Sequence, residues 1–321
     1  MPDFCVDLND VREARVRIAE FVRTTPVFSF PELDELAGAS VSFKCENLQH
    51  IGAFKARGAM NAVLGLSDTD AKRGVVTHSS GNHAAAVARA GLLRGCDVHI
   101  VMPSNATENK LATIRKMGIV PVLSDPTTSA RMAAVEAIMK ETNGTLIHPF
   151  DAPATIAGQG TAALEMVEQM EAPDAVIVPI GGGGLLSGTV TVLKSLWPET
   201  LVIGAEPAWA DDAYRGWKSG RLEQPTRFDS VGDGLRSSLG QLTFPIIHEL
   251  VDDILLVDEE EIVSATKRMV ESTRMMVEPS GAVSFAALVK HRDRFQGKRI
   301  AVLISGGNLD LNHLPWKVDA S

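Results

Sequence analysis

Residues 175–197 read AVIVPIGGGGLLSGTVTVLKSLW, and this stretch decides the fold. Its apolar, β-branched beginning predicts a buried strand, the four glycines predict a turn, and the rest predicts a helix. The uncharged part, residues 175–193, approaches the length of a membrane span. Pro179 and the glycine run interrupt that part, so we expect a strand, a turn and a helix, and no membrane partner.

The same alternation of short apolar runs and helix-like segments extends along the chain. Further strands are expected at residues 75–77, 98–101, 120–123 and 201–203, and at 300–304. Helices are expected at residues 81–94, 107–117, 128–142, 155–170 and 185–197. Strands that are apolar throughout are typical of parallel sheets covered on both faces, so the expected class is α/β.

Composition excludes several other classes. A chain of 321 residues with 45% hydrophobic and 22% charged residues suits about two globular domains. Its three cysteines lie far apart without a CxxC pair, which predicts neither a zinc site nor a disulfide framework. The net charge of −9 and the lack of a basic cluster argue against nucleic acid as a partner. The first twenty residues mix acids and bases without the apolar core of a signal peptide, so we expect a cytoplasmic protein.

The glycine run is the first candidate binding element and consists of Gly181, Gly182, Gly183 and Gly184. Successive glycines let backbone N–H groups approach a ligand closely, and the N-terminus of the next helix is partially positive. A phosphate can therefore bind there without Lys or Arg. The run lacks the Gly-Lys-Ser/Thr ending of a Walker loop and the GxGxxG pattern of dinucleotide sites. A flexible turn without a ligand is the alternative.

Residues 77–83, THSSGNH, form a second polar turn between an apolar strand and an Ala-rich helix. Two hydroxyls, an amide and an imidazole at a helix N-terminus suit a carboxylate ligand. The alternative is that Ser80 merely caps the helix.

Two further turns complete the set. Lys55 lies among small and aromatic residues in GAFKARGA, where desolvation lowers an amine pKa as a Schiff-base lysine requires; a surface lysine is the alternative. Ser305 presents a hydroxyl after the strand at 300–304, where such a serine usually caps a turn. A phosphate site, a carboxylate site, a reactive lysine and a lone hydroxyl together match pyridoxal phosphate chemistry on an amino acid.

At these residues the chain resembles the fold-type II pyridoxal-phosphate enzymes, and within them the group of serine racemases, serine/threonine dehydratases and 3-hydroxyaspartate dehydratases. The resemblance covers nearly the whole chain. It rests on GAFKARGA, THSSGNHAAA, IHPFDAPATIAGQGT, PIGGGGLLSG, EPAWADD, VGDGLRSS and ISGGN in the family's order. It implies two open, mainly parallel twisted sheets covered by helices, as in a tryptophan synthase β-like fold. A small substrate-binding domain (66–151) is then inserted in a large cofactor-binding domain (1–65 and 152–321), and a homodimer is expected.

The resemblance also implies residue roles. Lys55 forms the Schiff base to pyridoxal 5′-phosphate. The residues implied to bind this cofactor are Phe54, Lys55, Asn82, Gly181, Gly182, Gly183, Gly184, Leu185, Gly234 and Ser305. Those implied to bind the substrate carboxylate are Ser79, Ser80, Asn82 and His83.

Ser305 would face the pyridine nitrogen of the cofactor. A neutral hydroxyl does not keep that nitrogen protonated as an Asp would, so the ring is a weaker electron sink and β-elimination is favoured over transamination. Ser80 matches the second acid/base of the racemases in this family. Lys55 and Ser80 are therefore the implied catalytic residues.

Substrate choice depends on a second cation near the pocket. A β-carboxylate such as that of 3-hydroxyaspartate needs one, and Arg131 in the loop TTSAR is the first choice, since an arginine binds a carboxylate with two parallel bonds. Arg236 is the second choice, with Ser237 as a neighbouring donor; either arginine is otherwise an ordinary surface residue.

Some residues depart from the family pattern. GAFK replaces the commoner GSFK, and Ala85 and Phe150 replace polar residues that contribute to a nucleotide site in the animal enzymes. Nucleotide activation is therefore not expected.

The loop EPAWADD carries Glu206, Ala210 and Asp212 after an expected strand. Hard divalent cations bind such carboxylates together with a backbone carbonyl and water, although acidic loops are commonly only solvated. Family members with this motif bind magnesium, calcium or manganese here, so the resemblance implies these three residues as ligands. Asp211 is a weaker candidate.

The expected function is a pyridoxal-phosphate ammonia-lyase that converts a small β-hydroxy amino acid (3-hydroxyaspartate, serine or threonine) into a 2-keto acid and ammonia. A racemase using Lys55 and Ser80 on opposite faces of the cofactor is the alternative. A binding protein that retains the fold without catalysis is a more remote one.

Overall fold

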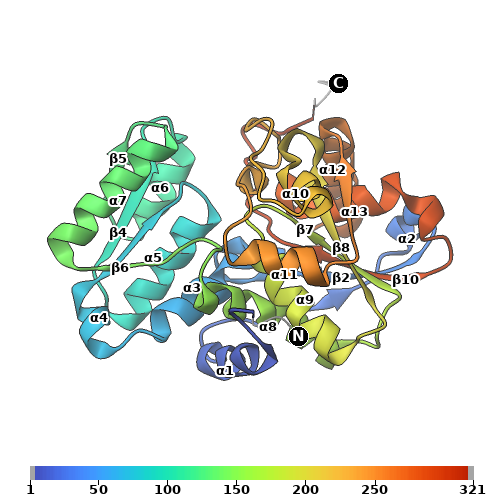
Figure 1. Cartoon of the computed structure of the whole chain (residues 1–321). Helices are drawn as coiled ribbons and strands as arrows, with labels where there is room; N and C mark the ends of the chain where they lie inside the picture. Colours follow the sequence, from blue (N-terminus) through green and yellow to red (C-terminus); the bar gives the residue numbers. More distant parts are fainter. Residues whose placement is uncertain (1–3, 317–321) are drawn as a thin grey trace.

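Within residues 4–316, which the computed structural model describes, the strands form two sheets that are covered by helices (Figure 1). The larger sheet has the order β1-β2-β10-β7-β8-β9. Its strands are β1 (Val27–Phe28), β2 (Ser40–Cys45), β7 (Ala175–Pro179), β8 (Leu201–Pro207), β9 (Asp253–Val257) and β10 (Arg299–Ile304). β1 runs antiparallel to β2, and the other neighbours are parallel.

The smaller sheet is parallel and has the order β5-β4-β3-β6. Its strands are β3 (Val75–His78), β4 (Val98–Pro103), β5 (Val122–Ser124) and β6 (Thr145–Leu146). The two parallel-rich sheets confirm the expected α/β class. All strands of the smaller sheet lie between residues 75 and 146, inside the segment expected as the small domain. The exact domain boundaries stay predictions.

Helices cover both sheets. They are α1 (Leu8–Ile18), α2 (Pro31–Ala37), α3 (Lys55–Leu64), α4 (Asp68–Arg73), α5 (Asn82–Arg94), α6 (Glu108–Lys116), α7 (Thr128–Thr142), α8 (Pro153–Gln169), α9 (Gly184–Leu196), α10 (Asp212–Ser219), α11 (Thr243–Leu250), α12 (Glu259–Thr273) and α13 (Pro279–Lys290). Short 3-10 turns are η1 (Glu46–Leu48), η2 (His50–Gly52), η3 (Ala208–Ala210), η4 (Asp233–Leu235) and η5 (Arg292–Arg294). No helix within residues 4–316 is long and apolar enough to cross a membrane.

The strands of the larger sheet bury both faces, as their continuous apolar runs predict. In β10, Val302 packs in one core with α2, α12 and α13, whereas Ala301 and Leu303 pack in a second core with α1, α8 and α9. Alternate residues of one strand thus belong to two hydrophobic cores, one on each face of the sheet. The loops at the carboxyl ends of the strands are not part of these cores and can carry binding and catalytic residues.

One expected strand differs in the structure. Residues 120–123 were expected as a buried strand, but β5 begins only at Val122, and Val120 is 85% exposed. The reason is that β5 is an edge strand of the smaller sheet, so half of its surroundings is solvent.

A buried set of charges joins α3 to the larger sheet. Arg57 Nε and one of its terminal nitrogens each donate to Glu46 at 2.8 Å, and the two terminal nitrogens each donate to Glu165 at 2.8 Å. Lys44 Nζ donates to Glu165 at 2.7 Å. The four side chains have no solvent exposure, and their two positive and two negative charges cancel. They connect β2, η1, α3 and α8 in one rigid unit.

Replacing Glu165 with alanine should lower the free energy of unfolding by roughly 3–5 kcal/mol, because Arg57 and Lys44 would stay buried without their shared partner. Urea-induced unfolding measures the change. Glu168→Ala on the same helix is the matched control, since its side chain is 58% exposed and its loss should cost less than about 0.5 kcal/mol. Equal stability of the two variants would contradict the role of the network.

Candidate active site

Lys55 begins α3 beside the carboxyl end of β10. The N–H of Phe54 donates to Ser305 O at 3.0 Å, which fixes the start of the helix to the turn after that strand. Lys55 Nζ donates to Pro149 O at 2.6 Å and lies 5.0 Å from the centre of the Phe54 ring. Burial lowers the pKa of Lys55 to about 8. The amine is therefore neutral far more often near pH 7 than an exposed lysine, as a nucleophile or base requires.

The glycine run forms the turn between β7 and α9, and backbone conformation or packing explains three of its four glycines. Gly183 has φ +87°, a left-handed conformation that glycine adopts without strain. A Cβ on Gly182 would lie 2.3 Å from the Phe150 ring, and one on Gly181 would lie 3.0 Å from Gly234 O. The turn therefore presents bare backbone at the N-terminus of a 13-residue helix, which fits a phosphate group.

The first turn of α5 offers backbone N–H groups for a carboxylate. The N-cap residue is Gly81, and no side chain caps the helix among the described residues. The alternative that Ser80 is the cap is therefore wrong. Ser79 Oγ accepts the N–H of Gly81 at 3.2 Å and shapes the turn, so the hydroxyl of Ser80 is left for other partners. Both serines are half-buried.

Burial keeps three imidazoles of this region neutral, and two of them, His83 and His148, lie near Lys55. His83 Nε2 lies 2.9 Å from Ile147 O and must be the donor, because a carbonyl oxygen only accepts. Burial, with Lys55 nearby, moves the pKa of His83 well below its ordinary value. Its Nδ1 is buried and has no hydrogen-bond partner among residues 4–316, so the ring presents a lone pair. Burial also lowers the pKa of His78, and that of His148 to about 4.

Glu278, a buried carboxylate in the same region, was not predicted from the sequence. Its side chain is 7% exposed, and Asn82 Nδ2 donates to Glu278 Oε1 at 2.7 Å. Burial and the neighbouring Asp233 raise the pKa of Glu278 to about 7. The Glu-Pro-Ser-Gly run at 278–281 indicates a helix start, but nothing in it indicates a partner 196 residues away.

Ser280 connects two predicted cofactor residues. Its Oγ accepts the N–H of Gly234 at 3.0 Å, and its carbonyl accepts the hydroxyl of Ser305 at 3.3 Å. Ser305 is 3% exposed. The structure thus brings Phe54, Ser305 and Gly234 into one polar network beside Lys55.

The two predicted substrate arginines lie in different surroundings. Arg131 lies in α7 rather than in a loop, and its positive charge lowers the pKa of the nearby His78. The guanidinium of Arg236 donates through Nε to Ser230 O at 2.8 Å, so a backbone carbonyl holds it. Ser237 is exposed. Arg131 and Arg236 both stay predictions for binding a second carboxylate.

Of the two predicted carboxylate ligands of a cation, Glu206 lies at the end of β8 and Asp212 lies at the start of α10. Glu206 and Asp212 are 1% and 2% exposed, so a negative charge on either carboxylate would be buried and would require a balancing partner. Glu206 accepts two backbone N–H groups at 2.9 Å, whereas Asp212 Oδ1 is buried without a hydrogen-bond partner in the described part of the chain. Burial raises the pKa of Asp212 to about 7 and that of Glu206 well above its ordinary value.

The rest of this loop limits the donor set. Asp211 is paired with Arg215 at 3.0 Å and accepts the hydroxyl of Thr226 at 3.1 Å, so it is not available as a ligand. Ala210 lies in η3 and is fully buried. Within residues 4–316 no three His, Cys, Asp or Glu side chains gather around one point. A cation here would therefore rely on two carboxylates, the Ala210 carbonyl and water.

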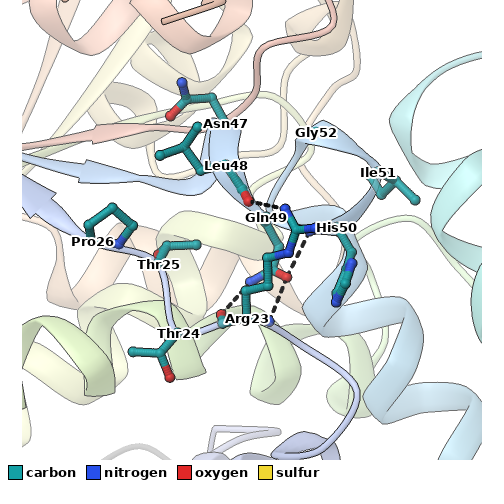
Figure 2. A pocket seen from close by; sticks show the side chains of 10 residues that line it. All are labelled: Arg23, Thr24, Thr25, Pro26, Asn47, Leu48, Gln49, His50, Ile51 and Gly52. Carbon is teal, nitrogen blue, oxygen red and sulfur yellow. Dashed lines mark hydrogen bonds between the residues drawn. The ribbon is translucent and has the colours of Figure 1, made fainter.

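A cavity of about 640 Å³ lies in front of the segment that leads to Lys55 (Figure 2). Gln49 holds this segment to the preceding loop, because its side chain exchanges hydrogen bonds of 2.9 and 2.7 Å with the backbone of Arg23. Arg23 in turn donates to Leu48 O at 3.1 Å. The cavity is lined by residues 23–26 and 47–52 and is separate from the glycine turn.

Comparison with known proteins agrees with this geometry. Residues 18–306 match the model of the family described as pyridoxal-phosphate dependent enzyme. The chain belongs to this family.

Its relatives include two kinds of enzyme. The chain is 46% identical over 307 residues to the β-hydroxyaspartate dehydratase of Paracoccus denitrificans, covering 96% of this chain and 98% of that protein. It is 43% identical over 317 residues to the serine racemase of Dictyostelium discoideum, covering 98% of both chains.

Two solved structures share the fold over nearly the full length. Maize serine racemase has a TM-score of 0.94 at 41% identity, with 96% of this chain and 95% of that chain covered. The threonine deaminase of T.th. has a TM-score of 0.91 at 42% identity, with 95% and 99% covered. These matches confirm the expected fold-type II architecture.

The lowered pKa of Lys55 gives a pH prediction. The rate at which the cofactor-free protein takes up pyridoxal phosphate covalently, followed by visible absorbance, should rise with pH around a midpoint near 8, because only the neutral amine is nucleophilic. Nα-acetyl-lysine is the control and should titrate near its ordinary pKa of about 10.4. A midpoint for the protein as high as that of the control would contradict the desolvated environment.

Proposed function

We propose that this protein is a pyridoxal-phosphate-dependent ammonia-lyase that acts on a small β-hydroxy amino acid and releases a 2-keto acid and ammonia. The observation that supports this proposal most strongly is the position of Lys55, a desolvated amine beside the turn after β10. The β-hydroxyaspartate dehydratase and threonine deaminase among its relatives support an elimination reaction. Candidate substrates are 3-hydroxyaspartate, serine and threonine.

The residues around Lys55 fit pyridoxal phosphate. Its phosphate would bind to the backbone of residues 181–184 and of Leu185, which is buried in the first turn of α9. Phe54 and Gly234 would flank the ring, Ser305 would face its nitrogen, and Asn82 would face its ring oxygen. When bound, the cofactor supplies an aldehyde that reacts with amines and a ring that withdraws electron density.

The chain itself would bind the substrate and move its protons. The N–H groups at the start of α5, with the hydroxyls of Ser79 and Ser80, would hold the α-carboxylate. His83 would contribute its backbone N–H, because its ring nitrogen facing away from Ile147 carries no proton. Lys55 Nζ would take the proton from the substrate α-carbon, and the electron pair of that C–H bond would form a double bond to the β-carbon. The β-hydroxyl would take up a proton and leave as water.

A dicarboxylate substrate would need one more cationic contact. Arg131, near His78, would bind the β-carboxylate of 3-hydroxyaspartate; Arg236, with Ser237 as its neighbouring donor, is the second choice. Serine and threonine have no such group. Arg131 would therefore decide between the dicarboxylate and the smaller substrates.

Racemisation is the second candidate function. The serine racemases among the relatives support it, and so does Ser80, whose hydroxyl is not used as a helix cap. Ser80 would return a proton to the substrate on the face opposite to Lys55. A protein that binds the cofactor without catalysis is a third and more remote reading, which the desolvated Lys55 argues against.

Three further properties belong to the proposal. A divalent cation (magnesium, calcium or manganese) would bind Glu206, Asp212 and the Ala210 carbonyl, because the unpartnered oxygen of Asp212 needs a positive partner. We also infer a cytoplasmic location from the reduced, widely spaced cysteines. A homodimer is inferred from the family alone.

The substrate assay tests the function directly. Protein loaded with cofactor and magnesium is incubated separately with L-serine, L-threonine and the isomers of 3-hydroxyaspartate. We expect equal amounts of 2-keto acid and ammonia from at least one of them, and loss of both products in Lys55→Ala. Chiral analysis of recovered serine measures racemisation. A loaded protein that gives no keto acid from any substrate would refute the lyase and favour the racemase.

Magnesium should raise the melting temperature by at least about 2 °C at saturation, and more at pH 8 than at pH 6. The pKa of Asp212 rises from 3.8 to about 7 on folding without a cation, so the folded chain retains a proton that the unfolded chain has lost. Stability therefore falls as pH rises through this window, and the cation offsets the loss.

Asp212→Asn should abolish the magnesium effect. Asp211→Asn is the matched control and should keep it, because Arg215 already neutralises Asp211. A magnesium effect that survives in Asp212→Asn would place the cation elsewhere.

A further inference from the structure

Glu278 occupies a helix N-cap position but does not cap its helix. It precedes Pro279 at the start of α13, and its side chain makes no capping hydrogen bond there. Instead the carboxylate reaches across to the first turn of α5. A Cβ on Gly306 would lie 2.2 Å from Glu278 Oε1, so the turn after β10 closes tightly over the carboxylate. The carboxylate is thus held at a defined place beside the candidate site.

Glu278 and Asn308 together fix the amide of Asn82. Asn82 Nδ2 donates to Glu278 Oε1 at 2.7 Å, and Asn82 Oδ1 accepts from Asn308 Nδ2, also at 2.7 Å. Asn308 cannot turn over freely, because its Nδ2 also donates to Ile51 O at 2.8 Å. The oxygen and nitrogen of an asparagine amide have nearly the same shape, so only such partners select one orientation.

This arrangement leaves Asn82 one N–H to direct toward a ligand. Its oxygen is occupied, and one of its two Nδ2 hydrogens is used on Glu278. Turning the amide over would place its oxygen against the carboxylate of Glu278 and its nitrogen against the donor of Asn308. Both contacts would then be repulsive.

We propose that Glu278, supported by Asn308, is a positioning residue that holds the Asn82 amide with its free N–H toward the ring oxygen of the bound cofactor. The inference rests on the proposed function, in which Asn82 faces that oxygen. It adds a residue that acts on the cofactor only through Asn82.

No ion pair holds Glu278 in the described part of the chain. The hydrogen-bond donors to Glu278 are neutral: the Asn82 amide at 2.7 Å and the N–H of Asn308 at 3.1 Å. Asp233 opposes its charge and Lys110 favours it from a distance, while burial raises its pKa. A glutamine would fill the same volume without the cost of burying a charge. A glutamine, however, has one acceptor oxygen for two donors, whereas a carboxylate accepts both.

The consequence of Glu278→Gln is therefore specific. The backbone N–H of Asn308 cannot be reversed, so the glutamine oxygen must face it. Its NH₂ group then faces Asn82 and forces the Asn82 amide to turn over. The free N–H of Asn82 would be replaced by an oxygen that repels the cofactor ring oxygen.

The test is a double-mutant cycle on cofactor binding. The dissociation constant for pyridoxal phosphate and the visible absorption spectrum of the loaded protein are measured for wild type, Glu278→Gln, Asn82→Ala and the double variant. We expect Glu278→Gln to weaken binding about tenfold and to shift the spectrum. In the Asn82→Ala background the same substitution should have no further effect.

A matched control and a second variant distinguish a specific effect on cofactor binding from poor folding. Glu259→Gln is the matched control, because Glu259, like Glu278, accepts one side-chain donor and one backbone N–H; here these are the hydroxyl of Ser230 and the N–H of Val231. Binding and spectrum should stay unchanged in this variant. Asn308→Asp changes an exposed side chain and should weaken cofactor binding and shift the spectrum as Glu278→Gln does. It therefore tests the inference even if Glu278→Gln folds poorly.

Three results would overturn the inference. The first is wild-type affinity and spectrum in Glu278→Gln and Asn308→Asp. The second is a loss in Glu278→Gln that persists in full when Asn82 is alanine, which would mean that Glu278 acts independently. The third is a wild-type protein that takes up no pyridoxal phosphate, which refutes the proposed function itself.

Discussion

The buried pairing of Arg57 with Glu46 and Glu165 is the constraint on which the rest of the site depends. Arg57 lies two residues after Lys55 on α3, and its guanidinium is bound on two sides by carboxylates from η1 and α8. Taking these ions out of water is costly, and the cost is offset only when every partner is in place. The network therefore allows one position of α3 against the larger sheet. That position places the amine of Lys55 within 2.6 Å of Pro149 O.

The site combines this rigid placement with little fixed charge of its own. The expected phosphate contact is backbone at the N-terminus of α9, and the expected carboxylate contact is backbone at the N-terminus of α5. His83 and His148 are neutral because burial lowers the pKa of each. Lys55 is then the titratable cation proposed to take part in the chemistry. Its pKa near 8 follows from burial alone, without a second cation against it. Helix termini thus supply the attraction for anions, and the lysine stays free to exchange protons.

Much of this arrangement could be predicted from local sequence. The strand, glycine run and helix at 175–197 lie where expected, since the pattern depends on neighbours in the chain. Lys55 and Ser305 could be singled out for the same reason, because each follows a recognisable turn signal. Capping was harder to judge. Gly81 rather than Ser80 is the N-cap, and Ser79 accepts the N–H of Gly81 and shapes the turn before the helix.

The features that escaped prediction depend on pairs far apart in the chain. Glu278 meets Asn82 across 196 residues, and Arg57 meets Glu165 across 108. No spacing rule connects such residues, since the folded sheets alone bring them together. The exposed edge at Val120 escaped for a related reason, because an apolar run does not reveal which strand of a sheet lies outermost. The reactive side chains in local turns could therefore be predicted from the sequence, whereas the distant groups that orient them could not.

The central claim is that the fold delivers one lysine, Lys55, to the cofactor. Reduction of the pyridoxal-phosphate-loaded protein with borohydride makes the link permanent, and peptide mass spectrometry then locates it. We expect the pyridoxyl group on the peptide that contains Lys55, in an amount equal to the protein, and none on that peptide in Lys55→Ala. A stoichiometric label on a different lysine of the wild-type protein would contradict the claim.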